Sequence, residues 1–410
     1  MDIRGVEITK TQIGVFLMVW AIYLLSFTER LALPPVLPLI SKDLGLSATQ
    51  AGSYMTAFYI GYVCTQLPGG LLTDRFGYRK VLMGSLLAIG GATALMYIVS
   101  SYEMGFFFRV LAGVGSGAVF SSCMRAIFEW FPGKGRGTAV GILQTATSFG
   151  LMFANLLVPF VAKEHDWRVA FLVTGILPLF VLVFAWLFLK EKRTASERAA
   201  MRQTQSADFW KDVLSLTKNR NLMVLALTGF FAMAATWGTA TWANTYMNKS
   251  LQIPLVMAGA LMSTYGLAGA LCKPISGILT DIFYNKKKYL ISILLFCLAP
   301  ALLWFGTNTN VQMLYILIPV LGVFAFVYSP ITNTLIGELV PLRLAGTAAG
   351  FVNSCWQLGS LFAPSVIGLA LDLSNNNYFY AFAILALCAF LASMTILFIK
   401  QDQIVLIEKN

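Results

Sequence analysis

The sequence predicts an all-α membrane protein in which twelve transmembrane helices form two pseudo-symmetric bundles of six. Three observations predict this fold. The residues are 58% hydrophobic and only 11% charged, long apolar runs recur along the chain, and a motif of the first half returns in the second. Soluble domains are roughly a quarter charged, so the composition excludes that class. A helix also satisfies its own backbone polar groups within lipid.

Twelve apolar segments have the length of membrane-spanning helices, since a hydrocarbon core about 30 Å thick needs about 20 residues. They lie at roughly 13–38, 50–73, 81–100, 104–130, 138–162, 169–189, 219–247, 255–280, 289–306, 311–337, 347–371 and 378–399. The first is too long for a signal-peptide core and has no small-residue cleavage site after it. We expect an N-terminal bundle over 1–189, a polar cytoplasmic linker over 190–218 and a C-terminal bundle over 219–410.

Basic residues are distributed unevenly between the two predicted sides of the membrane. With a cytoplasmic N-terminus, inside segments hold 21 of the 29 Lys and Arg residues and outside segments hold four. Cytoplasmic loops carry such an excess, so we expect both termini inside a cell inner (plasma) membrane. The net charge of +11 then needs no nucleic-acid partner. The six cysteines lie in apolar segments without paired spacing, so we expect neither a disulfide framework nor a metal site. We also expect no cofactor, and we expect a monomer in the bilayer.

An internal repeat relates the two halves. Glu129-x-x-Pro132 followed by Gly137-Thr138-Ala139-x-Gly141 recurs 209 residues later as Glu338-x-x-Pro341 followed by Gly346-Thr347-Ala348-x-Gly350. The segment Gly70 to Asp74 likewise recurs 207 residues later as Gly277 to Asp281. Parallel repeats of six helices are typical of transporters whose substrate site lies near the middle of the membrane. The repeat therefore predicts a transport function.

Two motifs resemble those of major facilitator transporters. Gly70 to Lys80, GLLTDRFGYRK, resembles the loop between helices 2 and 3 of that superfamily, and Arg109-x-x-Ala-Gly-x-Gly resembles its helix 4 arginine motif. The stretch from Glu29 to Lys80, together with Arg125 to Pro132, is similar to the anion:cation symporters. These include galactonate, glucarate and hexuronate transporters, sialin and the vesicular glutamate carriers. The similarity covers about the first 140 residues.

Two positions depart from the pattern of these symporters. Glu29-Arg30 stands where the relatives usually carry Asp-Arg, and Ser116 stands where many carry a glutamate. The resemblance implies secondary transport of a small organic anion. It also implies that the missing glutamate takes part in proton coupling, so Ser116 leaves the coupling in this chain open.

Ionisable groups within the membrane are costly and are candidate functional groups. The Arg30 guanidinium can hold a carboxylate at two points, or it can form an ion pair with Glu29. Lys273 lies in a half with no acid inside a helix, so a substrate anion that bridges it to Arg30 would supply the missing charge. Alternatively, Lys273 extends toward the cytoplasmic interface. Glu29 is the candidate proton carrier, or it permanently neutralises Arg30.

Other polar residues complete the predicted sites. Arg109 and Arg125 are binding candidates that face about 160 degrees apart on an ideal helix, and Arg125 with Glu129 favours a local salt bridge. Further substrate-binding candidates are Tyr59, Gln144, Asn353 and Gln357. A cytoplasmic gate of ion pairs between the halves is predicted from residues at inner helix ends: Asp74, Arg75, Arg79, Glu129, Arg136, Asp281, Glu338 and Arg343.

The leading functional hypothesis is symport of a sugar acid or another carboxylate with protons by alternating access. Anion exchange without protons is the alternative that Ser116 favours. Drug:proton antiporters resemble this fold but usually carry a Gly-Pro motif on helix 5, and no Gly-Pro occurs between Gly141 and Pro159. The charged residues within the membrane are mainly cationic, which also disfavours cationic drugs as substrates. A membrane enzyme is disfavoured by the single histidine, His165, and the absence of a catalytic motif. A transporter-derived sensor would show no transport.

Overall fold

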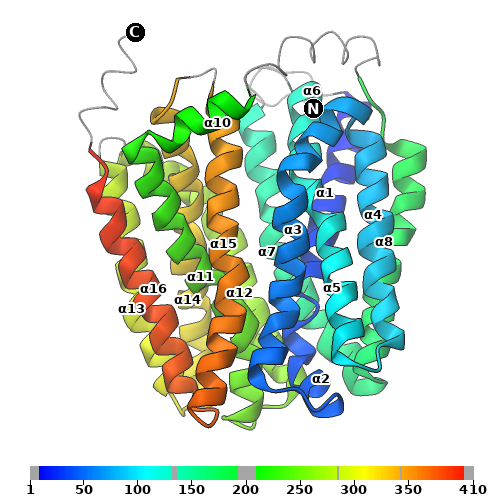
Figure 1. Ribbon diagram of the computed structural model, residues 1–410, viewed down its shortest axis with the longest axis vertical. Helices are drawn as coiled ribbons and strands as arrows, with labels where there is room; N and C mark the ends of the chain where they lie inside the picture. Colours follow the sequence, from blue (N-terminus) through cyan, green and yellow to red (C-terminus); the bar gives the residue numbers. More distant parts are fainter. Residues whose placement is uncertain (1–8, 132–135, 193–208, 284–285, 342–343, 401–410) are drawn as a thin grey trace. The chain divides into compact units, whose positions relative to one another are not determined.

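The structure is a computed structural model that describes residues 9–131, 136–192, 209–283, 286–341 and 344–400. Within these ranges the chain is helical and holds no β-strand (Figure 1), which confirms the predicted all-α fold. Contacts divide the chain into two compact units. The first comprises residues 1–45 and 57–206, and the second comprises 46–56 and 207–410. The boundary at residues 206 and 207 lies inside the segment predicted as a linker.

The helices follow the predicted segments to within a few residues, except that two predicted segments are split. Segment 13–38 breaks after Leu31, and segment 104–130 breaks at Ala118. The first unit is built from α1 (Lys10–Leu31), η1 (Pro34–Val36), α2 (Leu37–Asp43), α3 (Ala48–Phe76), α4 (Tyr78–Ala94), η2 (Leu95–Ile98), α5 (Tyr102–Gly117), α6 (Val119–Trp130), α7 (Arg136–Glu164) and α8 (Trp167–Phe188). The first turns of α3 belong to the second unit.

The second unit also contains a short helix within the predicted linker. Its helices are α10 (Phe209–Thr217), α11 (Arg220–Lys249), α12 (Leu255–Ile282), α13 (Lys287–Thr307), α14 (Val311–Glu338), α15 (Ala345–Leu373), α16 (Tyr378–Thr395) and η6 (Ile396–Phe398). The pairs α11 with α15, α12 with α14 and α13 with α16 pack most extensively.

Local sequence explains where several helices begin and end. The side chains of Asp166, Asn219 and Asn377 accept hydrogen bonds from backbone N–H groups at the first turns of α8, α11 and α16, which satisfies donors that have no partner within the helix. The chain turns from α3 into α4 at Gly77, whose φ of 86° favours glycine. Pro34 follows the end of α1, where its missing N–H leaves a backbone carbonyl without the donor that a continuing helix would supply.

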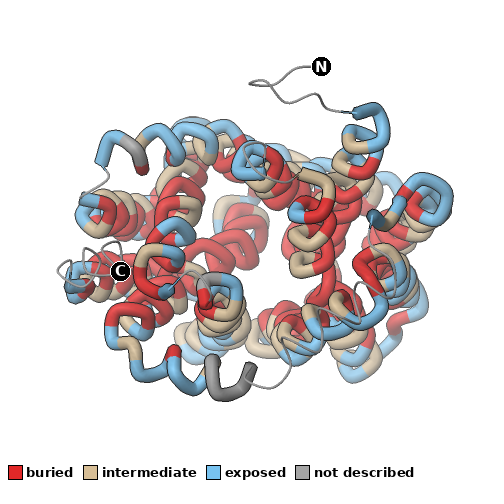
Figure 2. Tube along the Cα trace, turned by 90° about the horizontal axis from the view of Figure 1, so that it is seen from above, coloured by how far each residue is buried: buried red, intermediate tan, exposed pale blue. Residues whose placement is uncertain are grey.

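The surface of the described helices is apolar enough for lipid. Eleven helical spans, counted over the described residues, have the length and hydropathy needed to cross a membrane. Large apolar side chains such as Phe180, Trp186 and Ile316 are more than half exposed, and individual helices show exposed residues on one side and buried residues on the other (Figure 2). Soluble monomers rarely expose so much apolar surface. The chain is therefore a multi-pass membrane protein.

Helix α3 is long enough to span a membrane but is less apolar than those eleven spans. It carries a series of neutral polar residues, among them Ser53, Thr56, Thr65, Gln66 and Thr73. In a membrane helix such residues usually face other helices or a polar pathway. The prediction of a twelfth spanning helix at 50–73 therefore corresponds to the most polar of the long helices.

The first turn of α3 is held within the second unit by Asp372, near the end of α15. The Asp372 carboxylate accepts hydrogen bonds from the backbone N–H groups of Ala48 and Thr49, each at 2.8 Å, and from the Thr49 hydroxyl at 2.6 Å. Negative charge at a helix N-terminus is favourable because the N–H groups there lack partners within the helix. This contact explains why residues 46–56 group with the second unit.

Close helix contacts recur in the two units at the sequence offset of the repeat. A Cβ added to Gly113 would lie 1.9 Å from the Phe58 carbonyl oxygen. In the second unit, a Cβ on Gly322 would lie 2.4 Å from the carbonyl oxygen of Tyr265. The glycines are 209 residues apart and the aromatic residues 207 apart. The repeat is thus a repeat of helix packing as well as of sequence.

The same correspondence holds for the contact of α1 with α7 and of α11 with α15. A Cβ on Gly150 would lie 2.7 Å from the carbonyl oxygen of Leu24, and one on Gly359 would lie 1.9 Å from that of Phe230. Distances below 3.0 Å to backbone are incompatible with a side chain. These glycines therefore permit the close approach of the helix backbones.

We expect Gly359→Ala to destabilise the protein by about 1–3 kcal/mol, because the new methyl group would overlap the backbone of α11. Gly350→Ala on the same helix is the matched control, since a Cβ there meets nothing within 4 Å. Thermal unfolding of the purified variants checks this. Equal melting temperatures for the two variants would show that the helices separate at little cost.

Candidate functional site

Arg30, on the last turn of α1, is surrounded by aromatic rings of the first unit. Its side chain is only 1% exposed. The carbon at the centre of its guanidinium lies 4.3 Å from the ring centroids of both Phe27 and Tyr62, and 5.5 and 5.6 Å from those of Phe58 and Tyr59. Aromatic faces attract a cation without consuming its N–H groups. The cage therefore stabilises the charge and leaves its hydrogen-bonding capacity available.

The polar atoms of Arg30 and Glu29 do not satisfy one another. Among the described residues, Nε and Nη1 of Arg30 and both carboxyl oxygens of Glu29 have no hydrogen-bond partner, and no ion pair joins the two side chains. Burying unsatisfied polar groups of this kind costs several kcal/mol. A buried guanidinium with open donors is complementary in charge and geometry to a carboxylate.

Arg109, on α5, holds the end of α1 in place. Its Nη1 donates to the Glu29 carbonyl oxygen at 3.2 Å, and its Nη2 donates to that of Arg30 at 3.0 Å. Pro34 has no N–H to donate to the Arg30 carbonyl, as a residue of a continuing helix would. The guanidinium of Arg109 supplies that donor, so Arg109 fixes the backbone from which the Glu29 and Arg30 side chains project.

Glu29 is a fully buried carboxyl with polar groups of two other helices around it. The Thr93 hydroxyl of α4 and the Arg109 guanidinium of α5 face this carboxyl, and Glu29 is 0% exposed. The Thr93 hydroxyl itself has no partner within hydrogen-bond geometry among the described residues. A carboxyl in this position can take up a proton without breaking an existing hydrogen bond.

Ser116, also on α5, forms a neutral contact. Its hydroxyl lies 2.8 Å from that of Ser26 on α1, and both side chains are buried. Two hydroxyl groups can satisfy each other by sharing one proton donor. The position at which similar symporters carry a glutamate is therefore occupied here by an uncharged hydrogen-bonded pair.

In the second unit, Lys273 on α12 lies against an aromatic cluster. Its Nζ is 5.3 Å from the ring centroid of Phe326 on α14, and the side chain is half-buried. The Phe326 ring in turn contacts the rings of Trp237 and Tyr265 at centroid distances of 5.9 and 5.2 Å. Both units thus place a membrane cation on aromatic faces. In the first unit these cations include Arg30 and also Arg109, whose guanidinium carbon lies 4.8 Å from the Phe58 ring centroid, and in the second unit they include Lys273.

Ser148 and Gln357 are buried polar side chains at corresponding positions of α7 and α15. Ser148 is 0% exposed and Gln357 is 7% exposed, and the Ser148 hydroxyl and the Gln357 carbonyl oxygen have no hydrogen-bond partner among the described residues. Gln144 and Asn353, one turn earlier on these helices, are half-buried. Ser148 and Gln357, which the repeat aligns at an offset of 209, stay predicted binding candidates.

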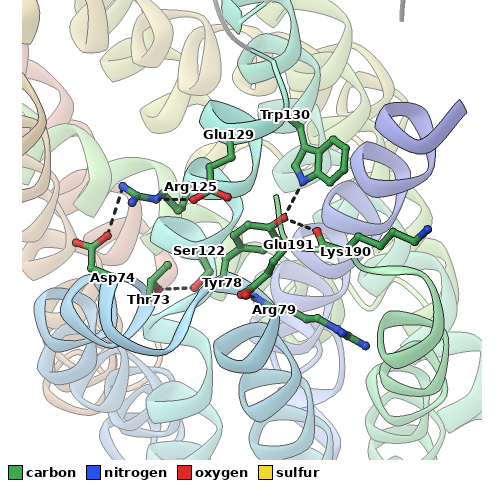
Figure 3. A network of polar contacts seen from close by, with 10 residues as sticks. All are labelled: Thr73, Asp74, Tyr78, Arg79, Ser122, Arg125, Glu129, Trp130, Lys190 and Glu191. Atoms are coloured by element: carbon green, nitrogen blue, oxygen red, sulfur yellow. Dashed lines mark hydrogen bonds and ion pairs between the residues drawn. The ribbon is translucent and has the colours of Figure 1, made fainter. Parts of the chain in front are cut away.

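Arg125 belongs to a different cluster from Arg109, at the ends of α3 and α6 (Figure 3). Its Nε lies 3.0 Å from a Glu129 carboxyl oxygen, and its Nη1 lies 3.4 Å from one of Asp74. The predicted salt bridge between positions i and i+4 is confirmed. Arg125 is therefore part of an ion-pair cluster, and its role in substrate binding stays a prediction.

A second group of contacts in this cluster joins the start of α4 to the residues after α8 (Figure 3). The Trp130 indole donates to the Tyr78 hydroxyl at 2.7 Å, and that hydroxyl donates to the Lys190 carbonyl. The Arg79 backbone N–H donates to the Glu191 carboxylate at 3.1 Å. Arg79 is thus engaged within the first unit through its backbone.

The remaining gate candidates show varied surroundings. Glu338 forms an ion pair with the buried Lys287 inside the second unit, whereas its counterpart Glu129 pairs with Arg125. The guanidinium of Arg75 lies over Phe76, and that of Arg136 lies over Phe128. The side chain of Asp281 and the whole of Arg343 lie outside the described residues. The predicted gate between the halves stays a prediction.

Several residues of these sites were not predicted from the sequence. The rings of Phe27, Phe58 and Tyr62 around Arg30 belong to α1 and α3, and aromatic residues are too common in membrane helices to indicate a cage. One feature of the sequence could have indicated the contact of Arg109 with α1. Pro34 has no N–H, so the Arg30 carbonyl four residues earlier needs a donor from elsewhere. A second feature could have indicated Gln66 on α3, because the repeat places it at the position of Lys273.

We expect Arg109→Lys to destabilise the protein by about 1–3 kcal/mol, because one ammonium group cannot donate to two carbonyls in the geometry of the guanidinium. Thermal unfolding of the purified variant measures this. Arg75→Lys, at an exposed position, is the matched control and should unfold like the unmodified protein. An unchanged melting temperature for Arg109→Lys would contradict the supporting role.

Comparison with known proteins assigns the chain to a family. The model of the Major Facilitator Superfamily matches residues 19–364 and 225–408. The chain is 26% identical to the cis,cis-muconate transport protein of Acinetobacter baylyi over 95% of this chain and 94% of that protein. It is 24% identical to a probable galactarate/D-glucarate transporter of Escherichia coli, over 96% and 95% of the two chains.

The fold is shared with solved transporters. The structure of a nucleoside transporter superposes with a TM-score of 0.78 at 16% identity, over 93% of this chain and 99% of that one. At this identity the similarity concerns the fold alone. The family model and the transporter relatives make the chain a transport protein rather than an enzyme, and the chain belongs to the Major Facilitator Superfamily.

Proposed function

We propose that this protein is a secondary active transporter that carries a small organic anion, a sugar acid or another carboxylate, by proton-coupled symport with alternating access. The observation that carries the proposal is the Arg30 guanidinium, which is 1% exposed and keeps Nε and Nη1 without a hydrogen-bond partner among the described residues. A carboxylate would satisfy these donors and neutralise the charge. Relatives named as transporters of muconate and of galactarate or glucarate support an acid substrate.

Glu29 is the proton carrier in this proposal. Its buried carboxyl has no hydrogen-bond partner among the described residues and precedes Arg30 directly. The charged form of a buried carboxyl is disfavoured unless a cation compensates it. Arrival of a substrate anion at Arg30 places a second negative charge nearby, which favours uptake of a proton by Glu29. In this way, binding of the anion at Arg30 is coupled to binding of a proton at Glu29.

We further propose that the protein is a monomer in a cell inner (plasma) membrane with both termini in the cytoplasm. The excess of Lys and Arg in the predicted inside segments supports this orientation. The cluster around Arg125 and the ion pair of Glu338 would then lie at the cytoplasmic ends of the helices. In that cluster the Asp74 carboxylate is exposed, and an exposed ion pair contributes only about 0–1 kcal/mol, which suits a contact that breaks during a transport cycle.

We expect Arg30→Gln and Lys273→Gln each to weaken anion binding at least about 100-fold, because each removes a charged partner of the carboxylate. Lys42→Gln, at an exposed position, is the control. If one anion contacts both cations, the double variant should lose less than the sum of the single losses. Binding to purified protein measures this, and undiminished binding by Arg30→Gln would refute the proposed site.

We expect Glu29→Gln to abolish accumulation driven by a proton gradient while it preserves exchange of internal for external anion. The neutral amide mimics the protonated carboxyl, so the variant can still bind anion but cannot release a proton. Uptake into proteoliposomes, with and without an inward proton gradient and with and without internal anion, separates the two activities. Gradient-driven accumulation by Glu29→Gln would exclude Glu29 as the carrier.

Exchange of anions without protons is the second candidate function, and the Ser26–Ser116 pair favours it. That pair contributes two hydroxyls where similar symporters have a titratable carboxyl. An exchanger would require internal anion, ignore the gradient and tolerate Glu29→Gln without change. The same proteoliposome experiment on the unmodified protein therefore decides between symport and exchange.

A further inference from the structure

Gln66 is a buried amide that the proposed transport mechanism has not yet used. It lies on α3, is 8% exposed, and its side-chain carbonyl oxygen has no hydrogen-bond partner among the described residues. Leaving a buried amide unsatisfied costs free energy, and natural proteins seldom keep such a group without a reason. A ligand that donates a hydrogen bond would remove this cost.

The position of Gln66 on its helix directs it to the Arg30 site. Tyr59, Tyr62 and Gln66 are spaced by three and four residues, so they share one face of α3. The first two of these residues place their rings against the Arg30 guanidinium. Gln66 follows Tyr62 by four residues, which is about 6 Å along the helix. The amide therefore stands one helix turn beyond the aromatic cage.

The internal repeat singles out the same position. The offset of 207 that aligns Gly70 with Gly277 also aligns Gln66 with Lys273, the membrane cation of the second unit. Each helix has a proline close after this position, Pro68 in α3 and Pro274 in α12. Proline interrupts the backbone hydrogen bonds of a helix. Both helices continue through the proline. Prolines within corresponding segments of the two halves of a transporter point to the region of its substrate site.

We propose that Gln66 determines substrate specificity by hydrogen-bonding a hydroxyl group of the anion whose carboxylate is bound by Arg30. This inference rests on the proposed function. An amide both donates and accepts hydrogen bonds, as a hydroxyl does, and it carries no charge to repel or neutralise the carboxylate. The separation of about one turn from the cage places the recognised hydroxyl several bonds away from the carboxylate. The substrate class is therefore a hydroxylated acid, such as an aldonic acid.

The test uses Gln66→Met, which keeps the length of the side chain and removes its polar atoms. The full-length protein is purified, and binding is measured for D-gluconate, D-galactonate and the analogues of each that lack one hydroxyl. Adipate and cis,cis-muconate serve as acids without hydroxyls. Gln312→Met, at an exposed position on the first turn of α14, is the matched control.

We expect the unmodified protein to bind one of the hydroxylated acids and to lose about 10- to 100-fold in affinity when one particular hydroxyl, beyond the carbon next to the carboxylate, is absent. Gln66→Met should bind the complete acid about 10- to 100-fold more weakly and should no longer distinguish that analogue. Its affinity for acids without hydroxyls should be unchanged. The control should behave as the unmodified protein.

Three other results would overturn the inference. An equal loss of affinity for every acid, with a lowered melting temperature, would make Gln66 a structural residue, because loss of an unsatisfied buried amide should not reduce stability. Preference of the unmodified protein for adipate or muconate would refute the hydroxyl contact and leave organic-anion transport intact. Failure to bind any acid would overturn both the inference and the proposed function.

Discussion

The arrangement of the first unit depends on keeping the Arg30 charge inside a membrane helix bundle. Solvent is excluded from the guanidinium, so its neighbours must supply the stabilisation that water would otherwise provide. Aromatic faces from α1 and α3 do this without occupying the N–H groups. Arg109 holds the backbone behind it through the Glu29 and Arg30 carbonyls. Arg109 thus fixes the backbone from which the Arg30 side chain projects.

Much of the fold was predictable because lipid imposes strong constraints on sequence. The lengths of the apolar segments follow from bilayer thickness, and most helices agree with them to within a few residues, whereas segment 13–38 breaks after Leu31. The break at Ala118 was not predicted, because Gly113 to Ala118 reads as one continuous small-residue helix surface. This break affects the expected angle of about 160 degrees between Arg109 and Arg125, which holds only for an unbroken helix.

The sites were predictable only where charge marked them. Arg30, Lys273 and Glu29 stand out because ionisable residues are rare in membrane helices. Gln66 and Ser148 do not, since neutral polar side chains in such helices often serve packing. The repeat aligns them with Lys273 and Gln357, and both are buried with a polar atom that has no hydrogen-bond partner among the described residues. The repeat conserves packing more closely than chemistry. Glu129 pairs with Arg125 one turn away, whereas Glu338 pairs with Lys287 from another helix.

The aromatic contacts around Lys273 have an optical consequence. The Phe326 ring contacts both the Lys273 ammonium group, at 5.3 Å, and the Trp237 indole, at 5.9 Å. Indole emission depends on the electric field of nearby charges. If the proposed anion binds at Lys273 it changes this field, and the emission spectrum of Trp237 would then report that binding without an attached dye.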